Sequence, residues 1–423
     1  HEESSDYTWD VSSEDVINLN STSISTTSTK VTISGTTATI NAAGNFRVNG
    51  SLTNGKIIVD AASTDLVRVI LNGITLTNTS GTALYVKKSK KTIINLVGGT
   101  TSTITDGSTY ADTTGGQNAA IYAKCPYSIF GSGTIKVNAN YEDGISGKDG
   151  LVIASGAYNV TAKDDGIRGK DFLIIHDGAF TINSVGDALK SDNDANTNVG
   201  YVTIDAGTYN ITATQGDGIA AQTNLTLKGG NYTITTGGGS SITPSSTVST
   251  KALKGDGKIE IAGGTYTLNS SDDGLNSNKG VSISGGTINL GTADDGIHAD
   301  SSITISGGNV TITKAYEGIE SPIINVSGGV VNVTASNDGF NATYGTVSGG
   351  TESNDGSQLN ISGGIVIAAA SDAIDSNGNI TITGGTVIVC GPTSQPEEGI
   401  DFNGTFNMNG GYLISAGSNA NMT

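Results

Sequence analysis

The chain has 423 residues, of which 61 are glycine and only 5 are proline. Frequent glycine with so little proline argues against collagen and against a disordered linker, and it favours many tight turns between short strands. The formal net charge of −18 argues against a nucleic-acid partner held through its phosphates. No apolar run approaches the roughly 18 residues that a membrane span needs.

The N-terminus is polar, and we expect a flexible segment over residues 1–15, followed by one folded domain over residues 16–423. From Val31 onward, runs of alternating β-branched residues are separated by Gly, Asn and Ser, which predicts strands joined by turns. The first expected strands cover residues 31–33, 38–40, 46–48, 57–59 and 67–71. No segment of about ten or more residues combines helical periodicity with capping residues, so we expect almost no helix.

A short motif, Asp294-Asp295-Gly296-Ile297, recurs in altered form along most of the chain, and we call the residue before the apolar one the anchor. The anchors are Gly144, Gly166, Ala188, Gly218, Ala252, Gly274, Gly296, Gly318, Gly339, Ala373 and Gly399, with weaker copies at Ala83 and Ala120. From Gly144 onward they are 22, 22, 30, 34, 22, 22, 22, 21, 34 and 26 residues apart. A period near 22 predicts a solenoid whose coils accept loops at fixed points. The longer steps place these loops at residues 191–200, 236–250, 344–356 and 392–396.

Each coil repeats one pattern of strands and turns. After the anchor Gly296 come Ile303 and Ile305, the turn Ser306-Gly307-Gly308, and then Val310 and Ile312. Three strands and three turns predict an all-β, single-stranded parallel β-helix with about 22 residues per coil and equivalent residues stacked about 4.8 Å apart. The general preference for right-handed parallel crossovers predicts a right-handed helix.

One column of the coils is aromatic in its first half. It reads Tyr158, Phe180, Tyr209, Tyr232 and Tyr266, and it turns aliphatic afterwards. We therefore expect an aromatic stack inside the core rather than a platform for sugars. The two cysteines, Cys125 and Cys390, are too many coils apart to form a disulfide, and we expect both to be buried as small apolar residues.

Acidic residues gather just before the anchors. The position directly before the anchor reads Asp143, Asp165, Asp187, Asp217, Lys251, Asp273, Asp295, Glu317, Asp338, Asp372 and Glu398, and the one before it adds Glu142, Asp164, Asp272, Asp294 and Glu397. An aspartate that caps backbone N–H groups at a turn explains one carboxylate per coil. Two stacked carboxylates repel each other unless a cation neutralises them, which predicts at least one bound calcium ion.

The position two after the anchor shows where the acidic residues are densest. Asp401 joins Glu397 and Glu398 in one coil, with Asp372 and Asp375 one coil below, and Glu320 joins Glu317 and Asp295. The run Asp192-Asn193-Asp194-Ala195-Asn196 is a third possibility, although it lacks the glycine and the glutamate of an EF-hand loop. The expected calcium ligands are Asp164, Asp165, Asp187, Asp272, Asp273, Asp294, Asp295, Glu317, Glu320, Asp372, Asp375, Glu397, Glu398 and Asp401.

Repeats such as Gly-Gly-Thr-Tyr-Thr-Leu followed by Ser-Asp-Asp-Gly-Leu, residues 263–275, resemble those of a bacterial family of carbohydrate-binding β-helix proteins related in fold to pectate lyases. The resemblance covers nearly the whole chain from about Val31. It implies a right-handed β-helix that binds Ca²⁺ and a plant cell-wall polysaccharide, namely cellulose, polygalacturonate or both. The polar start Glu2-Glu3-Ser4-Ser5-Asp6 and the Thr/Asn/Gly-rich, Lys-poor composition predict a secreted or cell-surface bacterial protein. We expect a monomer with no membrane span and no nucleic-acid partner.

Two functions of different classes remain open. In the first, calcium bridges the acidic turns to the uronate carboxylates of a polysaccharide, with Arg168, Lys190, His298 and Tyr316 as expected substrate contacts. In the second, the protein is a calcium-dependent lyase that uses Lys190 or Arg168 as its base. Each acidic cluster carries only half of a lyase site, because no Lys or Arg follows Asp401 and a basic residue stands in place of the third acid beside Asp164 and Asp165. Because neither cluster contains a complete lyase site, the sequence favours binding without catalysis. A third possibility is a structural, adhesin-like stalk on the cell surface, which would need only the β-helix fold.

Overall fold

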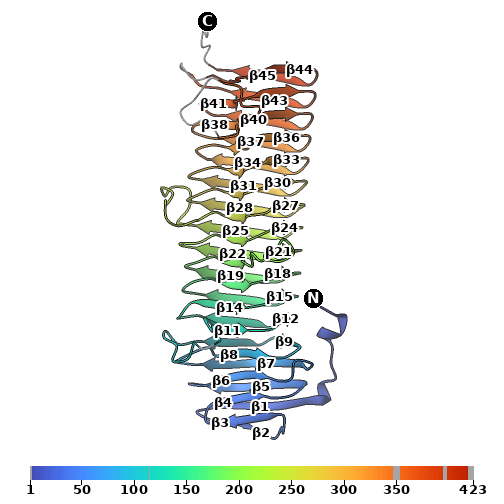
Figure 1. Cartoon of the computed structure of the whole chain (residues 1–423), viewed down its shortest axis with the longest axis vertical. Helices are drawn as coiled ribbons and strands as arrows, with labels where there is room; N and C mark the ends of the chain where they lie inside the picture. The colour runs from blue at the N-terminus through green and yellow to red at the C-terminus, as the bar shows by residue number, and fades with distance from the viewer. Residues whose placement is uncertain (1, 114, 346–352, 394–397, 418–423) are drawn as a thin grey trace. The chain divides into compact units, whose positions relative to one another are not determined.

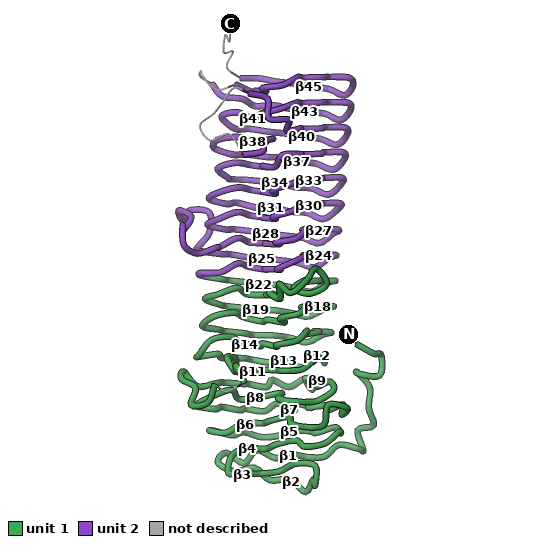
Figure 2. The backbone as a smooth tube through the Cα atoms, in the orientation of Figure 1, with its two compact units in different colours: residues 1–213 green, residues 214–423 purple. Residues whose placement is uncertain are grey.

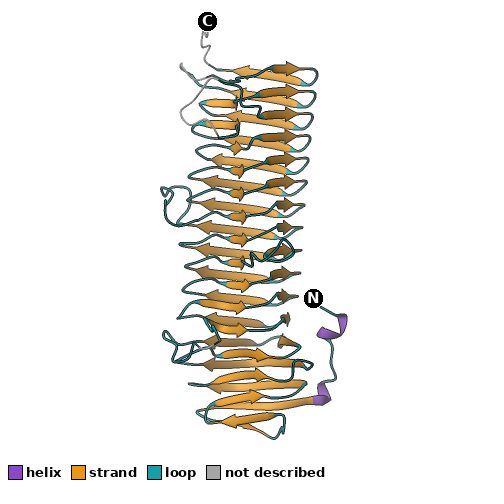
Figure 3. Cartoon of the chain, in the orientation of Figure 1, coloured by secondary structure: helices purple, strands orange, loops and turns teal. Residues whose placement is uncertain are grey.

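The computed structural model describes residues 2–113, 115–345, 353–393 and 398–417. Contacts within the chain define two compact units, unit 1 over residues 1–213 and unit 2 over residues 214–423 (Figure 2). Among the described residues the only helices are two short 3-10 turns, η1 (Ser4–Tyr7) and η2 (Val11–Ser13), and the rest of the regular structure is strand (Figure 3). The prediction of an all-β chain with almost no helix is confirmed.

Within each unit the strands lie in three columns, and a strand pairs in parallel with the strand at the same position in the next coil (Figure 1). At the start of unit 1, some strands pair antiparallel instead. We call the three columns the anchor column, whose strands start at or beside the anchor residues, the second column and the third column. The pairing follows the sequence repeat, since Leu275 pairs with Ile297 and Ile297 pairs with Ile319. These steps of 22 residues confirm the parallel β-helix and the expected coil length.

Unit 1 begins with strands β1 (Glu14–Ser21), β2 (Ile24–Thr26), β3 (Val31–Ser34) and β5 (Gly44–Leu52). Its anchor column contains β4 (Thr37–Ile40), β6 (Lys56–Asp60), β8 (Leu84–Lys88), β11 (Ala119–Ala123), β14 (Asp143–Gly147), β17 (Ile167–Gly169) and β20 (Leu189–Ser191). The second column contains β7 (Leu66–Thr77), β9 (Lys91–Leu96), β12 (Tyr127–Gly131), β15 (Leu151–Ile153), β18 (Phe172–Ile175) and β21 (Tyr201–Ile204). The third column contains β10 (Thr101–Thr105), β13 (Thr134–Asn138), β16 (Ala157–Thr161), β19 (Ala179–Ser184) and β22 (Thr208–Ala213). At the start of the unit, β1 pairs antiparallel with β2, and β3 pairs antiparallel with β4.

Unit 2 also has three columns of strands. Its anchor column contains β23 (Ile219–Ala221), β26 (Leu253–Gly255), β29 (Leu275–Ser277), β32 (Ile297–Ala299), β35 (Ile319–Glu320), β38 (Asp338–Ala342) and β41 (Asp372–Ser376). The second column contains β24 (Leu225–Leu227), β27 (Ile259–Ile261), β30 (Gly280–Ile283), β33 (Ser302–Ile305), β36 (Ile323–Val326), β39 (Gln358–Ile361), β42 (Asn379–Ile382) and β44 (Phe406–Met408). The third column contains β25 (Asn231–Thr236), β28 (Thr265–Ser270), β31 (Thr287–Thr292), β34 (Asn309–Lys314), β37 (Val330–Thr334), β40 (Ile365–Ala369), β43 (Thr386–Cys390) and β45 (Tyr412–Ala416).

The aromatic column lies inside the coils, as the sequence predicts. In unit 1 the rings of Tyr158 and Phe180 stack with centroids 4.7 Å apart, and those of Phe180 and Tyr209 stack at 4.8 Å. In unit 2 the rings of Tyr232 and Tyr266 stack at 4.6 Å. All five rings are buried, and the phenol of Tyr266 donates its hydrogen bond to a backbone carbonyl at 2.8 Å. The column is therefore core, and it offers no surface to a sugar.

The two cysteines differ in burial. Cys125 is buried, as predicted, whereas Cys390 is exposed, so the prediction for Cys390 is wrong. The reason is the alternation of side chains along a strand. In β43, Val387 and Val389 point into the core, which turns the next residue outward.

The anchor glycines are required by the close approach of neighbouring coils. A Cβ atom on Gly274 would lie 2.5 Å from the carbonyl oxygen of Gly296, and one on Gly296 would lie 2.4 Å from that of Gly318. Real Cβ atoms do not approach backbone oxygens this closely. Glycine at these anchors lets the backbone of one coil lie directly on the next, which brings the residues before the anchors into a row.

The N-terminal segment contacts the second column of unit 1. Arg68 donates to the backbone carbonyls of Ser5 at 2.7 Å and of Asp6 at 3.1 Å, and Lys91 forms an ion pair with the carboxylate of Asp6. The flexibility expected for residues 1–15 and the single domain expected for residues 16–423 stay predictions. Among the described residues, no helix is long and apolar enough to cross a membrane.

Candidate functional site

The carboxylates directly before the anchors hold neighbouring coils together. In unit 1 the side chain of Asp143 accepts a hydrogen bond from the backbone N–H of Asp165 at 3.3 Å, and Asp165 accepts one from Asp187 at 2.9 Å. In unit 2 Asp273 accepts one from the N–H of Asp295 at 3.2 Å. These aspartates cap backbone N–H groups, as one sequence interpretation expects, but the N–H group belongs to the next coil. In these coils one carboxylate is therefore structural.

In unit 1 the acidic residues are balanced by a lysine. Asp143, Asp164 and Asp165 bring carboxylate oxygens within 4.8 Å of one another. The ammonium of Lys190 lies 3.1 Å from Asp165 and 2.9 Å from Asp187. Burial lowers the pKa of Lys190, but the charges of Asp187 and Asp165 outweigh that effect and raise it. Lys190 therefore keeps its proton and neutralises this cluster.

Arg168 is engaged in the same way. Its guanidinium donates to Asp192 at 2.8 Å and 3.0 Å and lies 4.0 Å from Asp143. Asp192 belongs to the loop run that the sequence offers as a third calcium site, and the next residue, Asn193, donates to Asp171. The first two oxygen-bearing side chains of this run are therefore already paired. The strong pairing also leaves Arg168 and Lys190 poorly suited to act as a base.

A second acidic cluster, Asp272, Asp273 and Asp294, lies in unit 2, again with oxygens within 4.8 Å of one another. Lys251 occupies a position that is acidic in the other coils from Gly144 onward, and its ammonium lies 2.7 Å from Asp272 and 3.0 Å from Asp273. Burial, followed by the charges of Asp273 and Asp272, raises the pKa of Asp294. In this cluster too, a lysine ammonium supplies the positive charge that the carboxylates would otherwise need from a bound cation.

The third cluster has no such lysine. Asp295, His298 and Glu320 bring ligand atoms within 4.8 Å of one another. His298 Nδ1 lies 3.2 Å from Asp295 and 3.9 Å from Glu320, and its Nε2 lies 3.2 Å from Asp300. The described ion pairs place no Lys or Arg on Asp295, Glu317 or Glu320. This cluster therefore carries negative charge that the neighbouring side chains balance only through a histidine.

The environment of this cluster moves its pKa values upward. The hydrogen bond to Asp295 raises the pKa of His298 above its usual range. Burial, followed by the hydrogen bond and the charge of Glu317, raises the pKa of Glu320. Burial raises the pKa of Asp295 to about 6. Carboxylates crowded in this way are the ones that gain most when a cation joins them.

A cleft of about 220 Å³ opens beside the cluster. It is lined by His298, Ala299, Asp300, Glu320, Ser321, Pro322, Thr343, Tyr344 and Gly345. Within the described structure, the hydroxyl of Ser321 and the side-chain oxygen of Asn341 are buried and accept or donate no hydrogen bond. The amide nitrogen of Asn341 donates to Glu317 at 2.8 Å, which leaves its oxygen available on the same cluster.

The three clusters differ in how well they fit a calcium ion. Calcium takes six to eight oxygen ligands, mostly carboxylate and carbonyl oxygens. Lysine ammonium groups are already paired with carboxylates of the first two clusters. In the third, Asp295 and Glu320 offer carboxylates, Glu317 is hydrogen-bonded to Glu320 and to the amide of Asn341, and Asn341 offers a side-chain oxygen with no hydrogen-bond partner. The residues of the third cluster therefore fit a calcium ion, with the cleft supplying room for water or for a ligand.

The expected C-terminal cluster is described only in part. Glu397 lies outside the described residues. The side chain of Asp372 accepts a hydrogen bond from the N–H of Glu398 at 2.6 Å, as in the other coils. Burial, followed by the charges of Asp401 and Asp372, raises the pKa of Asp375 to about 7. This cluster is acidic, and whether it binds calcium stays a prediction.

The structure separates the four expected substrate contacts. His298 lines the cleft, and Tyr316 is 52% exposed in the same unit. Arg168 and Lys190 lie in unit 1 and are bound by their own aspartates. The sequence interpretation missed Asn341, Asp300, Ser321 and Tyr344 as parts of this site. Of these, only Asn341 carried a signal, because it occupies the same repeat position as His298 and Glu320.

The fold and the cleft together define a parallel β-solenoid that presents polar and acidic side chains on its coils. A model of the family described as carbohydrate-binding domain-containing protein matches residues 34–296. The chain is 35% identical over 224 residues to a carbohydrate-binding domain-containing protein of Acetivibrio thermocellus, and the match covers 52% of this chain and 74% of that protein. The protein belongs to this carbohydrate-binding family.

A solved structure of a polysaccharide lyase-like protein from C. thermocellum, a gadolinium derivative, is also similar. It aligns with a TM-score of 0.49 and 22% identity, over 70% of this chain and 100% of that one. At this level the likeness carries no inference about activity.

Proposed function

We propose that the protein binds an acidic plant cell-wall polysaccharide, such as polygalacturonate, through calcium held by Asp295, Glu317, Glu320 and Asn341. The supporting observation is the combination found only in this one of the three clusters described above: acidic side chains with no Lys or Arg pair, and a buried oxygen with no partner, beside an open cleft. The family supplies the carbohydrate partner in general terms. The chain is itself strongly acidic, so an anionic sugar needs a bridging cation.

The cleft also offers a surface for the sugar ring. Tyr344 is 46% exposed and lines the cleft together with Asp300 and Thr343. An exposed aromatic ring can pack against the face of a sugar while hydroxyl and carboxylate groups bind its edge. A site that depends on calcium at moderate affinity belongs outside the cell, where calcium is abundant. We therefore also propose an extracellular or cell-surface location.

Binding without catalysis is favoured over a lyase. A lyase needs a base that can release its proton near neutral pH. The ion pairs of Lys190 raise its pKa, and the cleft beside Glu320 has no Lys or Arg among its lining residues. Incubation with polygalacturonate and calcium should therefore give no increase in ultraviolet absorbance from unsaturated product. Such an increase would overturn this part of the proposal.

The test of the calcium site compares Glu320→Gln with the wild-type protein. We expect calcium to raise the thermal midpoint of the wild type, chelator to reverse this, and the variant to bind calcium at least about tenfold more weakly. Calorimetry with calcium and then with polygalacturonate measures both steps. Glu260→Gln, which removes an exposed carboxylate from β27 of the same unit, is the matched control. Unchanged calcium affinity in Glu320→Gln would contradict the assignment.

A further inference from the structure

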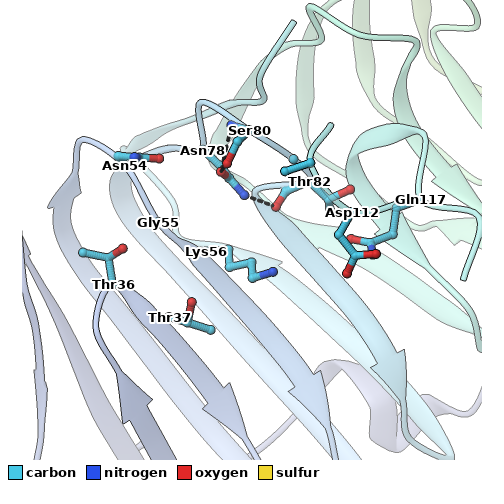
Figure 4. A pocket seen from close by; sticks show the side chains of 12 residues that line it. Thr36, Thr37, Asn54, Gly55, Lys56, Asn78, Ser80, Thr82, Asp112 and Gln117 are labelled. Carbon is cyan, nitrogen blue, oxygen red and sulfur yellow. Dashed lines mark hydrogen bonds between the residues drawn. The ribbon is translucent and has the colours of Figure 1, made fainter. Parts of the chain in front are cut away.

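A second hollow lies in unit 1, far along the sequence from the calcium cluster. It has a volume of about 240 Å³ and is lined by Thr36, Thr37, Asn54, Gly55, Lys56, Asn78, Ser80, Gly81, Thr82, Ala111, Asp112 and Gln117 (Figure 4). Its walls come from the turns that precede β4, β6 and β8 and from the segment between β10 and β11. Every lining side chain except that of Ala111 is polar or absent.

The walls of this hollow are held in place before any ligand binds. The amide of Asn78 is buried, donates to the carbonyl of Thr82 at 2.8 Å and accepts from the N–H of Ser80 at 3.1 Å. Gly55 forms part of the floor, and a Cβ there would lie 2.1 Å from the carbonyl oxygen of Thr36. These contacts fix the turns, so the site needs little reordering when a ligand enters.

Several polar groups remain directed at the hollow. The side-chain oxygen of Asn54 accepts from the N–H and the hydroxyl of Thr79, at 3.1 Å and 3.0 Å, so its amide nitrogen can still donate to a ligand. Figure 4 shows the ammonium of Lys56 extending into the space between Thr37 and Asp112. The hollow thus combines one cation, one anion, amides and hydroxyls, which are the donors and acceptors that sugar hydroxyl groups require.

The charges distinguish this hollow from the calcium cluster. Lys56 and Asp112 together contribute no net charge, so the hollow favours a neutral ligand, whereas the cluster at Glu320 is acidic. The volume lies below the roughly 300–1,000 Å³ of sites for drug-sized ligands, which limits the ligand to a short stretch of sugar chain. The family match, residues 34–296, contains all the lining residues of this hollow and ends before His298.

We propose that this hollow is a calcium-independent binding site for one or two neutral sugar residues of a polysaccharide, with Lys56, Asp112 and Asn54 making the direct contacts. The site is separate from the calcium cluster and does not depend on it. A protein with both sites would hold neutral and acidic sugar chains by different chemistry.

The test uses cellohexaose as the neutral probe and an oligogalacturonate of equal length as the acidic one, titrated in chelator by calorimetry or by NMR. We expect cellohexaose to bind without calcium, and Lys56→Gln or Asp112→Asn to weaken that binding by about tenfold. Glu320→Gln should leave it unchanged. Lys136→Gln on β13 and Asp194→Asn in the 191–200 loop are matched exposed controls, and thermal unfolding verifies that each variant is folded.

Three outcomes would overturn the proposal. Cellohexaose could fail to bind the wild type in chelator, it could bind Lys56→Gln and Asp112→Asn as tightly as the wild type, or it could require calcium. Loss of oligogalacturonate binding by Glu320→Gln, measured in a parallel titration with calcium present, concerns only the calcium cluster, so the two proposals fail separately.

Discussion

A single lysine shows how residue identity decides what an acidic repeat does. Lys251 replaces the aspartate or glutamate found at this position in the other coils from Gly144 onward, and it pairs with Asp272 and Asp273. The motif of two adjacent acids is therefore not in itself a cation site. We propose that it becomes one only where no Lys or Arg of the described chain pairs with it, as at Asp295 and Glu320.

Gly296→Ala tests the packing of the anchors. A Cβ atom at this position would lie 2.4 Å from the carbonyl oxygen of Gly318 and 2.7 Å from the side chain of Ile312. We expect a loss of about 2 kcal/mol or more in the free energy of unfolding, measured by denaturant titration. Gly291→Ala is the matched control, because its nearest neighbour would be 3.4 Å away and its φ is not positive. Equal stability of the two variants would contradict the close-approach argument.

At this scale the sequence predicted part of the candidate site. It brought Asp295, Glu317 and Glu320 together, because residues one period apart must stack. It did not identify Asn341 or Ser321, because an oxygen without a hydrogen-bond partner is a property of packing. It also gave no sign that Arg168 would be bound by Asp192 on a loop, because that depends on how far the loop folds back.

Among the elements, the N-terminal segment makes the contacts most distant in sequence. Glu2 and Asp205 lie 2.6 Å from the two ring nitrogens of His176. Burial lowers the pKa of His176, but the hydrogen bond to Asp205 and the charge of Glu2 outweigh it, so the pKa is raised. The positive form of His176 thus joins the N-terminal segment to the turn after β18.

This contact should depend on pH. Because the folded pKa of His176 is raised, its contribution is complete below the unfolded pKa of about 6.5 and is lost as the pH rises through the folded value. We expect the amides of residues 3–8 to exchange hydrogen more slowly at pH 6 than at pH 8, after correction for intrinsic rates. His176→Gln should remove this difference, and Asp177→Asn on the same turn should retain it. An identical pH response in His176→Gln would exclude this histidine as the cause.

The strands themselves were predictable because their pattern repeats. The runs expected at residues 31–33, 38–40, 46–48, 57–59 and 67–71 fall within β3, β4, β5, β6 and β7. Repetition fixes which residue of one coil lies on which residue of the next. It says nothing about a segment that does not repeat, so it could not predict the contact of Glu2 with His176 or the part of the unit 1 hollow lined by Ala111, Asp112 and Gln117.

For the molecule as a whole, the net charge of −18 is concentrated in rows of carboxylates. Burial raises the pKa of Asp143 to about 6, and burial with the charges of Asp401 and Asp372 raises that of Asp375 to about 7. In an unfolded chain these groups titrate near 3.9. The folded protein therefore binds more protons than the unfolded chain between about pH 4 and pH 7.

Stability should accordingly fall as the pH rises across that window. In chelator, we expect the free energy of unfolding to decrease from pH 5 to pH 7, by on the order of 2 kcal/mol for each such group. Denaturant titrations at pH 5, 6 and 7 measure the trend. Asp375→Asn, which cannot ionise, should have a shallower dependence. Stability that is flat or rising over this range would show that the carboxylates are compensated in another way.

The pairing of the coils ignores the length of the chain between them. His298 pairs with Glu320 after 22 residues, and Asn341 pairs with Asp375 after 34, yet each pair occupies the same outward position. Extra residues between two coils are therefore accepted without shifting these rows of outward side chains. A loop between two coils can therefore be replaced by another without changing how the coils pair. Such a replacement, in evolution or by grafting, could alter which ligand the protein prefers.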